Sequence, residues 1–323
     1  MQINDLVYGP INVTEPVLIE LINSKPLQRL KGINNAGASQ YAVEGTTISR
    51  YDHCVGVMLV LRILGASVEE QIAGLLHDVP HTAFSHVVDF VFPSDDHTFH
   101  EKFHETIIKN SEIPEILQKH GFDLNRLLDE HNFPLLERPA PSLCADRVDY
   151  TLRDMAGHYG PERSRKYISH FIVVNNEIMI DDALIAKQFA EDYLMMDTNY
   201  YSSPFELALY HILAGAIRIG LDKHIISEDD LFGDDAHVYN KLKNSNDKEI
   251  LAKLALLNPK LNIKLDPNNY DFFAKNKLRY VDPKFLTKDK TISKVSLAFE
   301  GFAEKLQQHR EARAKGVFIK IIS

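Results

Sequence analysis

Several side chains that can bind metal ions or carry protons fall within thirteen positions of this sequence. They are His77, Asp78, His81, His86 and Asp89. The apolar segment QIAGLL stands directly before them and predicts a buried helix that ends where the polar residues begin. An imidazole beside a carboxylate supplies one nitrogen and one oxygen ligand, so residues 71–89 indicate a metal site at the edge of a cleft.

A metal site needs further ligands from elements that pack against this helix. Two candidates stand in segments whose apolar spacing predicts helices: His53 in residues 50–64 and Asp146 in residues 142–157. Mixed nitrogen and oxygen ligation suits Mn, Mg, Fe, Ni or Zn and does not choose among them. The expected cofactor is therefore a divalent metal ion of unspecified identity.

The order His53, His77-Asp78, Asp146 resembles the H…HD…D pattern of the HD-domain metal-dependent phosphohydrolases. The match is broader than these four residues, because several blocks are similar to those of the dNTP triphosphohydrolase branch: LVYGPINV, LINSKPLQRLKGI, SRYDHCVGVM, IAGLLHDVPHTAFSHVVD and ADRVDYTLRD. The resemblance implies a helical HD core in which His53, His77, Asp78 and Asp146 hold the metal. In this family the metal acts as a Lewis acid and supplies the nucleophile that attacks phosphorus.

The resemblance also implies catalytic roles for residues near the HD pair. His81 and His86 match histidines that contact phosphate or transfer protons, and Asp89 matches an acid that orients one of them. His100 matches the general acid to the leaving oxygen. His104 is the alternative, because the loop before this block varies in length, and His97, His100 and His104 would also suit a solvated helix face.

A further set of residues matches substrate contacts in the family. Arg50 matches a phosphate contact, and Arg147 stands where a basic phosphate contact, usually lysine, is found. The alternative is that the two arginines pair with Asp52 and Asp149. Tyr150 and Asp154 match groups that meet the sugar, although Tyr150 would also suit a core position.

Three positions depart from the pattern of the triphosphohydrolases. Asn35 stands where a glutamine usually lies near the sugar. In the segment NYYSSPFELA, Tyr201 (or Tyr200) keeps a family tyrosine, but Ser203 and Pro204 replace a histidine and a basic residue. The metal site and the hydrolytic chemistry are still expected despite these departures. Strict specificity for dNTPs is not.

Composition limits the classes of partner. The chain of 323 residues carries a net charge of -9, which argues against an extended nucleic-acid surface but not against a small phosphorylated ligand. No basic leader is followed by an apolar stretch, and no apolar run approaches the roughly 18 residues of a membrane span. Cys54 and Cys144 are expected to be buried thiols, and a cytoplasmic location without membrane contact is expected.

The expected fold is mainly α, with an HD helical core and a small α+β C-terminal portion. The predicted division places the HD domain, with an N-terminal extended segment, in residues 1–220 and the α+β subdomain in residues 221–323. Residues 171–180 predict a β-hairpin across Asn175-Asn176. One helix is expected over 236–256, and residues 277–282 are strand-like.

The predicted activity is hydrolysis of a nucleotide phosphate ester, with a (deoxy)nucleoside triphosphate as the leading substrate. One alternative is a phosphomonoesterase or phosphodiesterase acting on a smaller ester. Another is a nucleotide-binding regulator without turnover. Family members often assemble, so the resemblance allows a homo-oligomer without setting its size.

Overall fold

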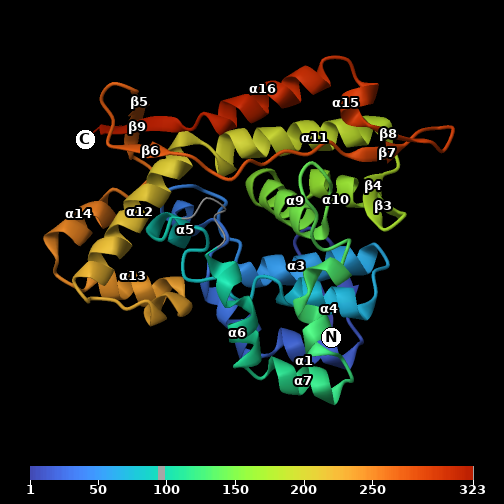
Figure 1. The fold of residues 1–323 in the computed structure, drawn as a ribbon, viewed down its shortest axis with the longest axis horizontal. Helices are drawn as coiled ribbons and strands as arrows, with labels where there is room; N and C mark the ends of the chain where they lie inside the picture. The colour runs from blue at the N-terminus through green and yellow to red at the C-terminus, as the bar shows by residue number, and fades with distance from the viewer. Residues whose placement is uncertain (94–98, 323) are drawn as a thin grey trace.

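The chain folds into a mainly helical molecule with three small sheets among its described residues (Figure 1). The computed structural model describes residues 1–93 and 99–322, and for His100 and Glu101 it describes the backbone alone. The helices of the first half are α1 (Pro16–Ile22), α2 (Lys25–Arg29), α3 (Arg50–Ile63), α4 (Val68–Leu76), α5 (Val87–Val91), α6 (His104–Lys109), α7 (Ile113–Lys119), α8 (Leu124–Leu128) and α9 (Ala145–Tyr159). Those of the second half are α10 (Glu162–Ile168), α11 (Ala183–Met196), α12 (Pro204–Asp222), α13 (Asp235–Lys243), α14 (Lys248–Ala255), α15 (Val295–Ala298) and α16 (Phe302–Ala314).

Two of the three sheets lie at the edges of the molecule in the view of Figure 1. The strands of the three sheets are β1 (Gln2–Asp5), β2 (Gly9–Asn12), β3 (Phe171–Val174), β4 (Glu177–Ile180), β5 (Asn262–Leu265), β6 (Phe272–Ala274), β7 (Lys284–Leu286), β8 (Ile292–Lys294) and β9 (Val317–Ile322). β1 and β2 form an antiparallel hairpin, and β5, β9 and β6 form an antiparallel sheet in that order. In the third sheet, β3-β4-β7-β8, the pairing of β4 with β7 is parallel and the other two pairings are antiparallel.

Helices α3 and α4 pack together and position the HD pair. Ser49 caps α3 by accepting from the backbone amide of Asp52, and the Asp52 carboxylate accepts in return from the amide of Ser49. Ser67 caps α4, whose buried apolar residues continue to its last turn. His77 follows directly at the C-terminal cap, so the predicted helices 50–64 and 68–76 are confirmed, and the chain turns polar where the helix ends.

Helix α9 packs on α3 and brings its acidic residues to the HD pair. The two helices approach closely because Gly56 has no side chain. A Cβ atom at Gly56 would lie 2.0 Å from Nη2 of Arg153 and 2.0 Å from Oδ1 of Asp149. The space that a side chain would fill is thus taken by a buried ion pair of α9.

Two clusters of buried apolar residues form the core. The first joins α1, α3, α4, α9 and α11, and the second joins α5, α12, α13 and α14. Residues after 220 enter both clusters: Phe285 and Phe302 lie in the first, whereas Leu261 and Ile319 lie in the second. The predicted division at residue 220 falls near the end of α12 and remains a prediction.

Helix α12 is, among the described helices, the one long and apolar enough by length and composition to cross a membrane. Its most apolar window is 56% buried inside the molecule, and ten of its residues are buried in the second cluster or beside it. These features are those of a central core helix in a folded domain.

Other expected elements agree with the structure to different degrees. The hairpin at 171–180 is confirmed, with Asn175 and Asn176 at φ values of 52° and 57° as its turn requires. The single helix over 236–256 is wrong, because α13 ends at Lys243 and α14 begins at Lys248, with Asp247 as its cap. The strand expected at 277–282 is also wrong, because this segment has no regular secondary structure.

The close approach at Gly56 predicts a large effect for Gly56→Ala. The added methyl group would displace the Asp149–Arg153 pair, so we expect a loss of about 1–3 kcal/mol in the free energy of unfolding. Gly215→Ala in α12 is the matched control, because its Cβ would meet only the flexible end of Lys253. Denaturant unfolding of both variants measures the difference, and equal stability of the two would contradict the proposed crowding.

Candidate active site

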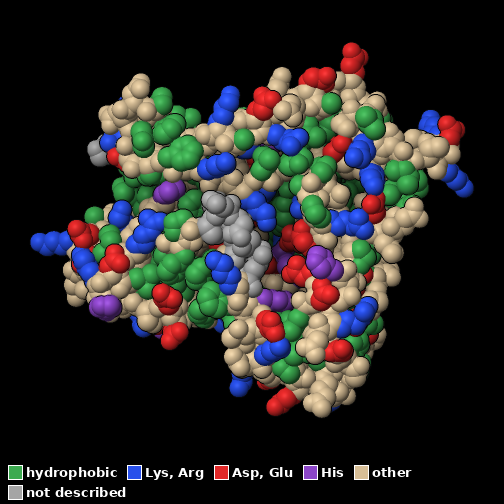
Figure 2. Space-filling view, viewed as in Figure 1, with side chains coloured by type: hydrophobic (Ala, Val, Ile, Leu, Met, Phe, Trp, Pro, Cys, Tyr) green, Lys and Arg blue, Asp and Glu red, His purple; other side chains and the backbone are tan. Residues whose placement is uncertain are grey.

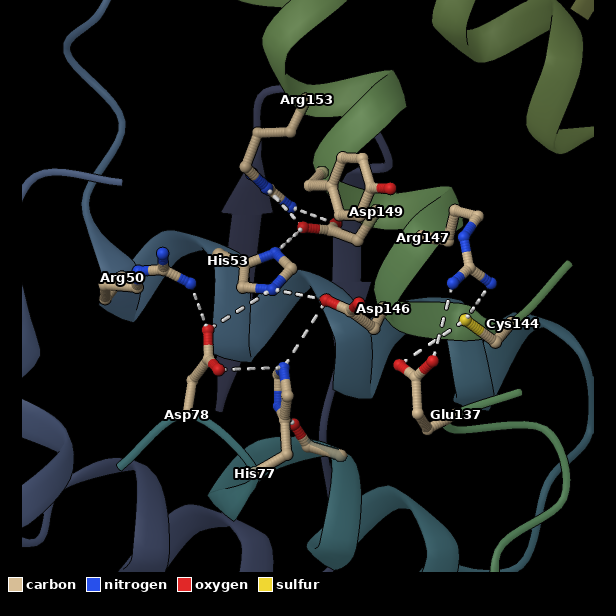
Figure 3. Close-up of polar contacts among 12 residues, drawn as sticks. Arg50, His53, His77, Asp78, Glu137, Cys144, Asp146, Arg147, Asp149 and Arg153 are labelled. Carbon is tan, nitrogen blue, oxygen red and sulfur yellow. Dashed lines mark hydrogen bonds and ion pairs between the residues drawn. The ribbon is translucent and has the colours of Figure 1, made fainter. Parts of the chain in front are cut away.

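The side chain of Asp149 in α9 fixes the ring of His53 in α3. Nδ1 of His53 lies 2.8 Å from Oδ2 of Asp149, and both side chains are buried. Arg153 donates to the same carboxylate from Nε (3.0 Å) and Nη2 (2.8 Å), and the hydroxyl of Tyr8 donates at 2.7 Å. Arg153 also pairs with Asp5 of β1 at 2.9 Å. The Nε2 side of His53 is thereby directed toward the HD pair (Figure 3).

The other three predicted metal ligands converge on Nε2 of His53. Asp146 Oδ1 lies 3.0 Å from this atom, and Asp78 Oδ2 lies 3.6 Å from it. Nε2 of His77 lies 3.5 Å from Asp78 Oδ1 and 3.6 Å from Asp146 Oδ1. The ligand atoms of His53, His77 and Asp146 all lie within 4.8 Å of one another, so one cation could contact all three.

The hydrogen bonding of His77 fits a metal ion. Its Nδ1 lies 2.7 Å from the carbonyl oxygen of Gly74, so this nitrogen carries a proton and Nε2 is the atom left to bind a cation. Nε2 is buried and has no hydrogen-bond partner among the described residues, although two carboxylates face it. Burial would lower the pKa of His77, but the charge of Asp78 and the contact with Asp146 raise it. Positive charge, from a proton or from a divalent metal ion, is therefore favoured at this nitrogen.

The carboxylates make this region favourable for positive charge. Burial alone would lower the pKa of His53, but hydrogen bonds to Asp146 and Asp149 and the charge of Asp78 raise that pKa to about 10. Burial likewise opposes ionisation of Asp78 and Asp146, yet the neighbouring imidazoles hold both pKa values well below their usual range. A metal ion must therefore displace a proton from His53, and its affinity should rise with pH.

The predicted catalytic histidines His81 and His86 line the cavity into which the metal cluster opens. Nε2 of His81 lies 3.3 Å from Oδ1 of Asp78, and the His81 and His86 rings meet edge to face at 5.0 Å. Asp89 Oδ2 lies 2.9 Å from Nδ1 of His86, as expected for an orienting acid. Their catalytic roles remain predictions.

The two candidates for the general acid differ in what the structure describes. The side chain of His100 lies outside the described residues, as does His97. His104 lies in a small cavity beside His77 and Glu130, and burial lowers its pKa. Its Nε2 is buried without a described hydrogen-bond partner. The choice between His100 and His104 stays open.

The two predicted phosphate-binding arginines are both engaged by the protein. Arg50 donates from Nη1 to Asp78 at 2.5 Å and from Nε to Ser85 at 2.9 Å. The alternative prediction that Arg50 pairs with Asp52 is therefore wrong. Nη1 of Arg147 donates to the carbonyl oxygens of Arg138 and Ser142, while its Nη2 lies 3.5 Å from Glu137. The guanidinium of Arg147 points away from the HD pair.

The metal cluster opens into a cavity of about 390 Å³. Figure 2 shows acidic, basic and histidine side chains gathered around a hollow on this face of the molecule. All six predicted substrate contacts line the cavity: Asn35, Arg50, Arg147, Tyr150, Asp154 and Tyr201. Their placement agrees with a substrate pocket, and their individual roles remain predictions.

Aromatic side chains form much of the far wall. The hydroxyl groups of Tyr150 and Tyr193 lie 2.5 Å apart, and Tyr150 meets Tyr201 edge to face at 5.6 Å. The ring of Tyr200 stacks on His158 at 3.9 Å. Tyr201 follows α11 in a π-helical turn (Asp197–Tyr201), a local geometry common at functional sites.

Two carboxyl groups of this wall have raised pKa values. Burial raises the pKa of Asp154 to about 6, despite its contact with the Tyr201 hydroxyl. Burial, together with the charge of Asp154, raises the pKa of Glu206 to about 8. Sequence reasoning missed Glu206, which lies three residues beyond the helix cap Ser203.

Other residues of the site were also missed. Asp149 and Arg153 share one helix face with Asp146, and this spacing was the available signal. Arg279 lies in an irregular segment of the C-terminal part, where no periodicity could mark it.

Comparison with known proteins agrees with the geometry. The HD domain family model matches residues 50–154, which contain all four converging residues. The uncharacterized protein YdhJ of Bacillus subtilis is 42% identical over 329 residues, covering 100% of this chain and 99% of YdhJ. The metal-dependent phosphohydrolase cns2 of Cordyceps militaris is 35% identical over 217 residues, covering 64% of this chain and 63% of cns2.

The chain belongs to the HD-domain metal-dependent phosphohydrolases. A more distant relative, deoxynucleoside triphosphate triphosphohydrolase SAMHD1 of Xenopus laevis, is 24% identical over 255 residues, covering 70% of this chain and 38% of SAMHD1. The crystal structure of a phosphohydrolase from Bacteroides thetaiotaomicron shares the fold, with a TM-score of 0.72 at 18% identity over 99% of both chains. HD-domain membership implies a divalent metal ion, and the converging ligands fit one.

The contact between Asp149 and His53 predicts a specific effect for Asp149→Asn. The variant keeps the shape but removes the charge that orients the imidazole, so metal affinity should fall about 10- to 100-fold. Calorimetric titration of the full chain with Mn²⁺ measures this change. Asp192→Asn, which alters another buried aspartate that pairs with Arg163, should bind metal normally. Unchanged affinity in Asp149→Asn would contradict the orienting role.

The raised pKa of Glu206 predicts a pH-dependent stability. Between its usual pKa of about 4.5 and its folded value of about 8, the folded chain holds a proton that the unfolded chain releases. The stability contribution is therefore full below pH 4.5 and is lost as pH rises through 8. Glu206→Gln removes this loss. The free energy of unfolding of the variant, relative to that of wild type, should therefore increase from pH 5 to pH 8 by up to about 1.4 kcal/mol per pH unit.

Urea unfolding at four pH values measures this difference. Glu304→Gln, at an exposed glutamate of α16, should follow the wild-type profile. Parallel profiles for Glu206→Gln and wild type would show that Glu206 ionises normally.

Proposed function

We propose that this chain hydrolyses a phosphate ester of a nucleoside, with a (deoxy)nucleoside triphosphate as the leading substrate. The observation that carries the proposal is that the metal cluster and an aromatic wall line one cavity. The metal cluster suits a phosphate group, while aromatic faces suit a flat base or one side of a sugar. The distant relatives named as deoxynucleoside triphosphate triphosphohydrolases support the triphosphate.

Phosphoryl transfer depends mainly on positioning and on stabilising charge at phosphoryl oxygens. A divalent ion held by His53, His77, Asp78 and Asp146 would supply Lewis-acid stabilisation there. The protein contributes the orientation of the ligands, through Asp149 on His53 and Gly74 on His77. His81 and His86 line the cavity beside this cluster, where their imidazoles could donate or accept protons, and burial lowers the pKa of His86.

The far wall offers polar contacts that suit a nucleoside. With a pKa of about 8, Glu206 is mostly protonated at neutral pH and can donate a hydrogen bond to a base or a sugar hydroxyl. Asn35 offers a buried Oδ1 that has no hydrogen-bond partner among the described residues. These groups, with Tyr150, Asp154 and Tyr201, are the proposed determinants of substrate choice.

A specific observation favours a second candidate, a phosphomonoesterase acting on a nucleoside monophosphate. A triphosphate needs several cations to balance its charge. Arg50 already donates to Asp78, and Arg147 already contacts backbone carbonyls and Glu137. Arg138, which also lines the cavity, donates to Pro134, Glu177 and Asn176. Fewer uncommitted cations suit a substrate with fewer charges.

One screen distinguishes the candidates. The full chain is incubated with nucleoside mono-, di- and triphosphates in the presence of Mn, Mg, Fe, Ni or Zn, and the products are identified. Tripolyphosphate with free nucleoside would support the leading proposal, and orthophosphate from monophosphates alone would support the second. No turnover with any nucleotide would contradict both and leave a nucleotide-binding regulator.

His77→Ala links any activity to the metal cluster. It removes one proposed ligand, so metal content and turnover should be lost together, with the rate falling at least about 100-fold. His170→Ala is the control, because His170 is partly exposed and pairs with Asp181 outside the cavity. Full turnover in His77→Ala would contradict the metal-dependent reaction.

A further inference from the structure

A partly buried arginine from the C-terminal part of the chain lines the cavity that holds the metal cluster. Arg279 lies in the irregular segment between β6 and β7, far in sequence from the HD residues that it joins. Its guanidinium lies over the ring of Tyr201, with Cζ 5.8 Å from the ring centroid. Arg279 therefore faces the aromatic wall of the same cavity that holds the metal cluster.

The guanidinium of Arg279 lacks the partners that a buried arginine normally has. Its Nη1 is buried and has no hydrogen-bond partner within residues 1–93 and 99–322. Among the same residues, no carboxylate lies within ion-pair distance of Arg279, in contrast to Arg50 and Arg147. A charged group whose buried nitrogen has no acceptor is unfavourable, so its position in the cavity points to an anion that binds there.

The charge of Asp197 acts on Arg279, but Asp197 makes its ion pairs with other groups. Asp197 is fully buried and lies 2.9 Å from Nε of Arg313 and 3.0 Å from Nε2 of His309. Arg279 therefore has no carboxylate partner of its own among the described residues.

The backbone around Arg279 is held in place. The side-chain amide of Asn276 donates to the carbonyl oxygen of Tyr201 at 2.6 Å. Nε2 of His309 in α16 lies 3.2 Å from the carbonyl oxygen of Arg279 itself. The backbone that carries Arg279 is thus held before any ligand binds, which lowers the entropic cost of binding.

We infer that Arg279 is a substrate-binding residue that binds a phosphate group through its planar guanidinium. The inference rests on the proposed function, because it assigns the anion to the substrate. It also gives the C-terminal segment a direct part in the site. Arg279 would then provide the uncommitted cation that Arg50, Arg138 and Arg147 do not.

The test measures binding of phosphate anions separately from turnover. Orthophosphate, pyrophosphate and tripolyphosphate are titrated calorimetrically into the metal-loaded full chain, for wild type, Arg279→Gln and Arg279→Lys. Arg279→Gln should weaken binding of the preferred anion roughly 10- to 100-fold, and Arg279→Lys should recover part of it. Arg126→Gln, at a surface arginine paired with Glu69, should bind as wild type does.

Two further readouts distinguish a binding role from a structural one. Arg279→Gln should raise KM for the hydrolysed substrate more than it lowers kcat. Its melting temperature should stay equal or rise, because a charged group whose buried nitrogen has no acceptor is removed. Unchanged anion affinity, or a lowered melting temperature with unchanged KM, would overturn the inference while leaving the proposed function intact. Arg279-dependent anion binding without nucleotide turnover would instead support the inference and reject the proposed function.

Discussion

The buried carboxylate of Asp149 is the interaction on which the site depends. It accepts hydrogen bonds from Arg153 and Tyr8 and lies against Nδ1 of His53, with no exposure to solvent. These contacts tie α9 to α3 and, through Arg153 and Asp5, to the N-terminal hairpin. Three parts of the chain that are distant in sequence thereby fix one imidazole ring. Without this fixed ring, His77 would be the one positioned nitrogen ligand left between the carboxylates of Asp78 and Asp146 among the four converging residues.

The charge balance of the cavity shows how the same protein can hold both a cation and an anion. Carboxylates gather at the HD pair, where they favour a metal ion. Arg50 contacts this cluster through Asp78 and is largely neutralised by it. Arg279, which has no ion-pair partner among the described residues, lies instead beside the aromatic wall. This separation suits a substrate whose phosphate group reaches from the metal toward the wall.

The metal cluster could be predicted from the sequence, whereas its support and its far wall could not. His77 and Asp78 follow an apolar helix directly, which is a local signal, and the resemblance to the HD-domain pattern singled out His53 and Asp146 in two other predicted helices. The role of Asp149 depends on the approach of α9 to α3 at Gly56, which is a tertiary contact. Arg279 lies in a segment without periodicity, and only the folded chain brings it to Tyr201. The helix break at 244–247 was overlooked because apolar residues continue on both sides of it, although Asp247 supplies a strong cap.

The central claim is that His53, His77, Asp78 and Asp146 form one metal site held by Asp149. Anomalous X-ray diffraction from crystals of the full chain soaked in Mn²⁺ tests it most directly. We expect an anomalous peak about 2.0–2.2 Å from Nε2 of both histidines and from a carboxylate oxygen of each aspartate. A peak bound elsewhere, or no peak here in crystals of protein that hydrolyses its substrate, would contradict this account.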